Sequence, residues 1–233
     1  MKQLYFSTPT TLAHAVIQRI LEKMQQINGE DFYLALSGGS TPLLLFDIWH
    51  SFYSEQTDWD HLKIFWVDER CVPPTDARSN FGATKERLLS KVPIPAANYF
   101  RMRGEEVPAK EAERYAQLVD QLLPKVNQLP SFHLVLLGIG EDGHTASLFP
   151  NQLQLVSSSK YCVNSVQPSS GQERITLTGS CLLNAAELFF LIAGKSKKDI
   201  LVKVLQPSCL LPAATLLHRG KKVTLFCDEE VKQ

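Results

Sequence analysis

The chain has 233 residues, of which 44% are hydrophobic, and its 24 Lys and Arg residues balance its 24 Asp and Glu residues. This size predicts one domain over residues 1–233 with a sizeable core. The balanced charge excludes an overall field that would attract nucleic acid or an anionic membrane, so local side chains must account for any anion binding. No apolar run is long enough for a membrane span, and the N-terminal residues do not resemble a signal peptide. We therefore expect a cytoplasmic protein.

Helices and strands are predicted to alternate through the first half of the chain. A helix over residues 11–27 repeats apolar residues at helical spacing and stops at Asn28-Gly29, a common helix end. A short apolar strand then leads into a glycine loop, and Pro42 suits the first turn of the helix that follows. The elements expected after the first helix are a strand at 32–36, a helix at 43–52, a strand at 62–67 and a helix at 80–89.

The second half continues the same pattern. An amphipathic helix over 109–126 precedes a strand at 132–137. The elements expected beyond it are strands at 161–166, 174–178, 188–193 and 223–227 and helices near 180–185 and 196–205. This alternation predicts an α/β fold, Rossmann-like and doubly wound, with a mostly parallel sheet and helices on both faces.

The segment Leu134 to Pro150, LVLLGIGEDGHTASLFP, concentrates chemistry at the end of a predicted strand. Its glycines match the GxGxxG dinucleotide fingerprint, but that reading also needs a long helix directly after the glycines and an acidic residue about 20 positions further on. Pro150 limits any helix here, and no carboxylate occupies the later position. The segment therefore predicts a site at a strand end, but not a nicotinamide site.

His144 is the candidate for proton transfer, because an imidazole can accept and return a proton near neutral pH. Asp142 is close enough in sequence to orient it. A capping or solvated histidine is the alternative reading. Metal binding is disfavoured because the sequence has no HxxxH or HxH pair, and the five scattered cysteines have no CxxC spacing. We expect no metal site and reduced, unpaired thiols.

A second candidate site is the loop Ser37-Gly38-Gly39-Ser40-Thr41 between a strand and a helix. Its glycines allow close backbone approach, and a helix N-terminus presents free N–H groups to an anion. The P-loop lysine and spacing are missing, which disfavours a nucleoside triphosphate and favours a phosphate monoester. An ordinary capped turn is the alternative.

Three cations lie beside predicted strand ends, namely Arg70, Arg174 and Lys195. Together they could neutralise a phosphate dianion, although each alone could equally form a surface ion pair. Asp68 and Glu69 either brace Arg70 or fix the backbone of the following loop.

Four segments together resemble the 6-phosphogluconolactonase family: LALSGGSTP from Leu34, WVDERCVPPTDARSN from Trp66, LGIGEDGHTASLFP from Leu137 and ERITLT from Glu173. Gly194-Lys195-Ser196 and Leu211-Pro212-Ala213-Ala214 extend the likeness over nearly the whole chain. The related glucosamine-6-phosphate deaminase/isomerases share the DGH core. They carry a DEY-like segment in place of Asp68-Glu69-Arg70 and an IAFNEP-like run in place of Thr145 to Pro150, so both departures favour the lactonase.

The resemblance implies hydrolysis of 6-phosphoglucono-δ-lactone to 6-phosphogluconate, in the pentose phosphate pathway, without metal or organic cofactor. His144 would activate water and Asp142 would orient the imidazole. Backbone N–H groups of the glycine loops would stabilise the oxyanion. The residues expected to hold the sugar phosphate are Ser37, Gly38, Gly39, Ser40, Thr41, Arg70, Gly140, Arg174 and Lys195.

Two other functions stay open at this point. One is a glucosamine-6-phosphate isomerase/deaminase, and the other is a non-catalytic sugar-phosphate sensor. The partner expected in each case is a small sugar phosphate, with no nucleic acid and no membrane, and the chain is expected to act as a monomer or a small homo-oligomer.

Overall fold

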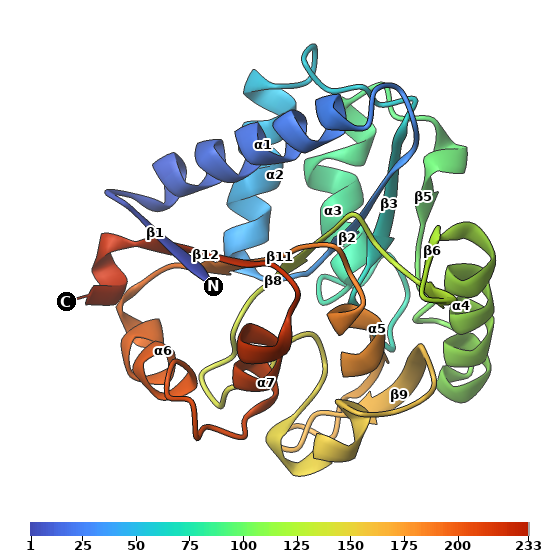
Figure 1. Cartoon of the computed structure of the whole chain (residues 1–233). Coiled ribbons are helices and arrows are strands. Elements are labelled where there is room, and N and C mark those ends of the chain that lie inside the picture. Colours follow the sequence, from blue (N-terminus) through green and yellow to red (C-terminus); the bar gives the residue numbers. More distant parts are fainter. Residues whose placement is uncertain (233) are drawn as a thin grey trace.

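The computed structural model describes residues 1–232 and shows helices and strands alternating along the chain (Figure 1). The helices are α1 (Pro9–Gln26), α2 (Ser40–Phe52), α3 (Asn80–Arg87), α4 (Pro108–Leu122), α5 (Gly179–Leu183), α6 (Lys198–Val204) and α7 (Pro212–Arg219). The strands are β1 (Lys2–Phe6), β2 (Phe32–Leu36), β3 (Leu62–Trp66), β4 (Asp68–Arg70), β5 (Tyr99–Phe100), β6 (Lys125–Val126), β7 (Leu129–Pro130), β8 (Leu134–Leu137), β9 (Cys162–Val166), β10 (Glu173–Leu177), β11 (Leu188–Ile192) and β12 (Val223–Asp228). Short 3-10 turns are η1 (Leu89–Lys91), η2 (Ala96–Asn98), η3 (Pro150–Leu155), η4 (Lys195–Lys197) and η5 (Glu229–Lys232).

The main sheet has seven strands in the order β1-β12-β11-β8-β2-β3-β5, and every pairing in it is parallel. From β2 the chain runs outward to β3 and β5, and it then returns to β8 and runs outward the other way. The strand order therefore reverses between β2 and β8. In open α/β sheets a ligand site lies at the carboxyl ends of the strands at such a switch point.

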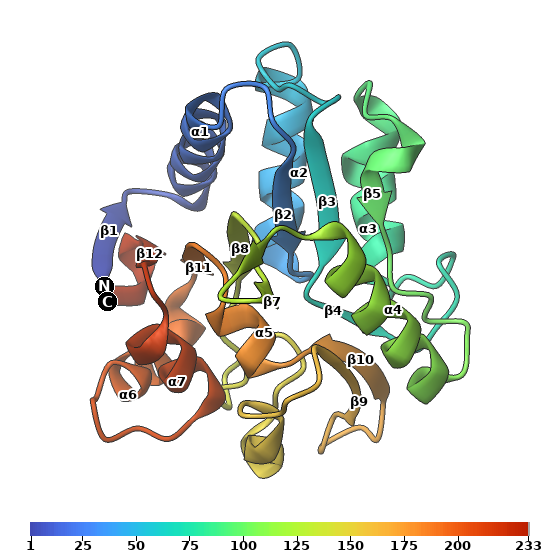
Figure 2. The same ribbon diagram turned by 45° about the vertical axis from the view of Figure 1, so that its right-hand side comes forward.

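Alternate side chains of the main sheet belong to two separate buried clusters. Leu34 and Leu36 of β2 pack with α1, α2 and α3, whereas Ala35 between them packs with α4, α5, α6 and α7. Strands buried on both faces have to be apolar throughout, which explains their continuous hydrophobic runs. Figure 2 shows α1 and α2 on one side of the sheet and α6 and α7 on the other. The prediction of a mostly parallel sheet with helices on both faces is confirmed.

The structure departs from the expected pattern at two of the predicted strands. β9 and β10 do not join the main sheet but pair with β4 in a second, antiparallel sheet with the order β4-β10-β9. Val67 connects the two sheets, because its N–H donates to Leu36 O and its C=O accepts from Leu177 N. The small sheet thus begins where β3 ends, next to the carboxyl end of β2.

Several element boundaries also differ from those expected. The helix predicted over 109–126 ends at Leu122, because Pro124 keeps Leu123 extended with ψ 144° and residues 125–126 pair instead with β7. α2 begins at Ser40, three residues earlier than expected. The strands β1, β4, β5 and β7 and the helix α7 had no predicted counterpart. Among the described residues no helix is both long and apolar enough to cross a membrane.

Candidate functional site

A pocket of about 280 Å³ lies at the carboxyl ends of β2 and β8, next to the small sheet. Nine of the predicted site residues line it: Ser37, Gly38, Gly39, Ser40, Thr41, Arg70, Gly140, His144 and Arg174. Asp142 is not in the lining but contacts His144. Lys195 begins η4 and does not line the pocket, whereas Lys197 of the same turn does.

The glycine loop places the N-terminus of α2 at the pocket. Gly39 is the N-cap of α2, with φ +112°, and no side chain caps this helix. The first turn of α2 also contains no acidic residue, so its N–H groups keep their partial positive charge for a ligand. The Ser37 hydroxyl is already used, because it donates to Leu136 O at 2.8 Å. Gly38 lies against Asn80, whose Oδ1 would be 1.8 Å from an added Cβ.

His144 is held in a tight loop that closes on itself. Gly140 N donates to His144 O at 2.8 Å, and Gly143 N donates to Gly140 O at 2.9 Å. Asp142 Oδ1 accepts from the backbone N–H of His144 at 3.0 Å and lies 2.5 Å from His144 Nδ1. Burial tends to raise the pKa of Asp142, but the hydrogen bonds from His144 and its ring together lower it. The carboxylate is therefore ionised where it meets the imidazole.

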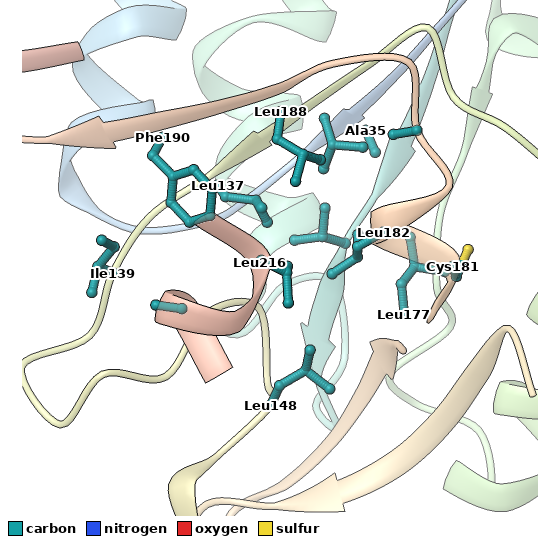
Figure 3. Close-up of a cluster of buried hydrophobic side chains, with 14 of the residues drawn as sticks. Ala35, Leu137, Ile139, Leu148, Leu177, Cys181, Leu182, Leu188, Phe190 and Leu216 are labelled. Atoms are coloured by element: carbon teal, nitrogen blue, oxygen red, sulfur yellow. The ribbon is translucent and has the colours of Figure 1, made fainter. Parts of the chain in front are cut away.

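Apolar side chains on either side of this loop anchor it to the core. Figure 3 shows Ile139 and Leu148 in one buried cluster with Leu137 of β8 and Leu216 of α7. Both anchors are at most 5% exposed. Packing therefore restrains both ends of the loop that carries His144.

Ser147 ties the same loop to the small sheet. Its Oγ donates to Asp68 Oδ2 at 2.7 Å, and its N–H donates to Thr176 Oγ1 at 3.1 Å. Its C=O accepts from Ser165 Oγ at 2.9 Å. One buried residue therefore joins the histidine loop to β4, β10 and β9, and so fixes the position of His144 relative to the arginines of that sheet.

Arg70 of β4 and Arg174 of β10 lie directly opposite each other in the antiparallel pair. Like charges in this arrangement are unfavourable. Neither arginine forms an ion pair within residues 1–232, and the Nε atoms of both are buried without a hydrogen-bond partner. Burial and the nearby Arg70 lower the pKa of Arg174. Two guanidinium groups that lack a direct ion-pair partner among the described residues and lie on one pocket wall are what a bound anion would stabilise.

Glu69 fixes the loop that separates Arg70 from α3. Its buried carboxylate accepts from three backbone N–H groups, those of Arg70, Asn80 and Phe81, at 2.7–2.8 Å, and from the Ser79 hydroxyl at 3.0 Å. Burial raises the pKa of Glu69 despite these bonds, which act to lower it. Of the two roles considered for Glu69, the geometry favours holding the backbone of residues 71–79.

Comparison with known proteins identifies the family of this chain. Residues 7–225 match the family described as glucosamine-6-phosphate isomerases/6-phosphogluconolactonase. The chain belongs to this family. It is 38% identical to a 6-phosphogluconolactonase of Haemophilus influenzae over 94% of this chain and 91% of that protein. It is 43% identical to one of Treponema pallidum over 75% of this chain and 73% of that protein.

Solved structures of the family share the fold. The 6-phosphogluconolactonase of Thermotoga maritima superposes with a TM-score of 0.84 at 27% identity, covering 98% of this chain and 99% of that chain. A monomeric glucosamine-6-phosphate deaminase superposes with a TM-score of 0.81 at 23% identity, covering 100% and 99%, which shows the fold alone.

Within this family fold, five polar residues of the pocket were not among the site residues predicted from the sequence, namely Asp68, Asn80, Thr145, Gln167 and Lys197. Asn80 follows the DER segment by ten residues, and only the loop fixed by Glu69 returns it to the pocket. Gln167 had no sequence signal, because the hairpin of β9 and β10 was not expected.

Metal ligation has no geometric support in the described part of the chain, where no group of three or more His, Cys, Asp and Glu side chains could hold an ion. All five cysteines are free thiols.

Proposed function

We propose that this chain hydrolyses 6-phosphoglucono-δ-lactone to 6-phosphogluconate in the pentose phosphate pathway, with His144 as the general base. Its family and its relatives named 6-phosphogluconolactonase support the reaction. The observation that carries the site is the combination, in one pocket, of a histidine held by a carboxylate and two arginines that have no ion-pair partner within residues 1–232.

The phosphate of the substrate binds where two arginines and a helix N-terminus bring positive charge together. Arg70 and Arg174 supply two guanidinium groups, and the uncapped N-terminus of α2 supplies backbone N–H groups on the same pocket. Ser40 and Thr41 add hydroxyls to this wall. A phosphate dianion in this position satisfies the buried Nε atoms and removes the repulsion between the two arginines.

His144 transfers the proton. When Nδ1–H donates to Asp142, the lone pair of the imidazole lies on Nε2, which accepts a proton from water. The resulting hydroxide attacks the lactone carbonyl carbon and forms a tetrahedral oxyanion. The C–O bond to the ring oxygen then breaks, and the imidazolium returns its proton to that oxygen, which gives the open acid. Asp142 stabilises the imidazolium between these steps.

The test is His144→Ala, with His50→Ala on the surface of α2 as the matched control. Loss of a general base lowers kcat by about 10²–10⁴-fold, whereas 6-phosphogluconate still binds because the arginines are unchanged. The lactone opens unaided in water, so each progress curve with freshly generated substrate needs a no-enzyme control. Unchanged turnover in His144→Ala excludes the proposed role of this residue.

Glucosamine-6-phosphate isomerisation and deamination are the alternative that the pocket keeps open, because a carboxylate other than Asp142, that of Asp68, lines it. An isomerase needs an acid that shuttles a proton between sugar carbons. Asp68 instead accepts from Ser147 Oγ at 2.7 Å, which favours a structural role. Release of ammonia from glucosamine 6-phosphate would establish the alternative, and tight ligand binding without turnover of any lactone would indicate a sensor.

A further inference from the structure

The turn between β9 and β10 brings to the pocket a residue with no role so far. Gln167 and Gln172 close this turn, because Gln167 N donates to Gln172 O at 3.0 Å. Gly171, with φ +67°, donates its N–H to Gln167 O at 2.9 Å. The backbone of Gln167 is thus fixed by two hydrogen bonds, and its side chain lines the pocket beside Arg174.

The amide oxygen of Gln167 has two donors. Arg174 Nη2 donates to Oε1 at 2.7 Å, and Ser170 Oγ donates to the same atom at 3.0 Å. The second donor, from within the turn, keeps the oxygen side of the amide toward the arginine. The opposite arginine is held in a similar way, because Arg70 Nη1 donates to the backbone oxygen of Arg78 at 2.7 Å. Each guanidinium is therefore oriented by a neutral oxygen and not by a carboxylate.

We propose that Gln167 is a positioning residue that orients Arg174 with a neutral acceptor, so that the whole charge of this arginine is available to a phosphate ester. The phosphate ester is the ligand class of the proposed function, on which this inference rests. A carboxylate at position 167 would hold Arg174 equally well but would neutralise it. The Gln167 amide orients Arg174 without neutralising its charge. Substitutions that change only the acceptor or only the charge at position 167 therefore test the role.

Two substitutions distinguish the role of charge from that of geometry. Gln167→Glu keeps an acceptor in place and adds a negative charge, whereas Gln167→Met keeps the shape and removes the acceptor. Gln172→Glu is the matched control, because it adds the same charge to the same turn but beside Arg78, which donates to Gln172 Oε1 at 2.9 Å. Arg78 already pairs with Asp76.

Binding of 6-phosphogluconate and of inorganic phosphate is measured by calorimetry, and KM and kcat are measured with the phosphorylated lactone. We expect Gln167→Glu to weaken binding of both ligands roughly 10- to 100-fold, Gln167→Met about 3-fold and Gln172→Glu less than about 2-fold. We expect KM to rise most in Gln167→Glu, less in Gln167→Met and least in Gln172→Glu, while kcat stays within about 2-fold of wild type in all three variants.

The order of the variants decides the outcome. A purely structural role makes Met more harmful than Glu, and that order, or equal binding by Gln167→Glu and wild type, overturns the inference. An equal loss of ligand affinity in Gln172→Glu also overturns the inference, because a negative charge anywhere in the turn would then explain the effect. The proposed function fails separately: wild type that binds phosphate esters but does not hydrolyse the lactone refutes the reaction and leaves the binding series valid.

Discussion

The imidazole of His144 occupies the space that a side chain at position 140 would need. A Cβ built on Gly140 would lie 2.1 Å from both Cε1 and Nδ1 of His144. The backbone of the same two residues is joined by the bond from Gly140 N to His144 O. Glycine at this position is therefore required by the ring above it, and not only by the turn.

Gly140→Ala is expected to displace the ring and break its contact with Asp142. Because the proposed proton transfer depends on that alignment, we expect kcat to fall by about 10²-fold or more, while the apolar anchors Ile139 and Leu148 keep the fold intact. Steady-state kinetics and thermal unfolding check this. Gly138→Ala is the comparison, because it adds the same methyl group to the same pocket wall at a position where the added Cβ meets no atom within 4 Å. Full activity in Gly140→Ala would contradict the placement of the ring.

Arg70→Ala is expected to discriminate between phosphorylated and unphosphorylated lactones. Loss of hydrogen bonds to a charged group costs about 1.5–3 kcal/mol, so kcat/KM for the phosphorylated lactone falls roughly 10- to 100-fold. Turnover of the unphosphorylated lactone changes little. Arg87→Ala, which removes only an exposed pair with Asp47, is the control. Equal losses for both lactones would place Arg70 outside the phosphate site.

The two lysines of η4 offer a direct comparison. Only Lys197 lines the pocket, so Lys197→Ala is expected to raise KM for the phosphorylated lactone roughly 3- to 10-fold. Lys195→Ala is expected to leave KM within about 2-fold of wild type. Kinetics of both variants at low and high salt measure the electrostatic part. A larger effect from Lys195→Ala would support the residue that the sequence suggested.

The raised pKa of Glu69 predicts how the stability of the fold depends on pH. Its pKa in the folded protein is raised by burial, so over a window above the ordinary Glu value the folded state keeps a proton that the unfolded chain has lost. The contribution of this group to the free energy of unfolding therefore falls as pH rises through that window. Glu69→Gln lacks the titration, so the stability difference between wild type and variant is largest at the acidic end.

Urea unfolding of both proteins from about pH 4 to about pH 7 tests this dependence. Glu86→Gln, on the exposed face of α3, controls for the loss of a surface charge. Parallel pH curves for wild type and Glu69→Gln would contradict the raised pKa.

The sequence predicted the five inner strands of the main sheet because they are largely buried and mostly apolar, but it did not predict the edge strands β1 and β5, which are partly exposed. The apolar runs of β2 and β8 stop directly before Ser37 and Gly138, so the ends of these two strands could also be predicted. The sequence did not predict that residues 162–166 and 173–177 would leave that sheet, because short strands of both sheets have similar local patterns. Gln167 and Lys197 could not be identified for a related reason: their place in the pocket depends on a hairpin and a 3-10 turn, which depend on tertiary contacts.

The junction at Val67, a residue whose N–H and C=O bond to different sheets, has a consequence for changing the enzyme. The arginines and Gln167 arrive on the small sheet, whereas His144 arrives on the loop after β8. With the proposed roles, affinity for the anionic end of a ligand and attack on its carbonyl are therefore encoded in different stretches of sequence. A library confined to residues 166–174 would vary the surroundings of Gln167 and Arg174, while Ser165 and Thr176, which bond to Ser147 of the loop that carries His144, stay unchanged.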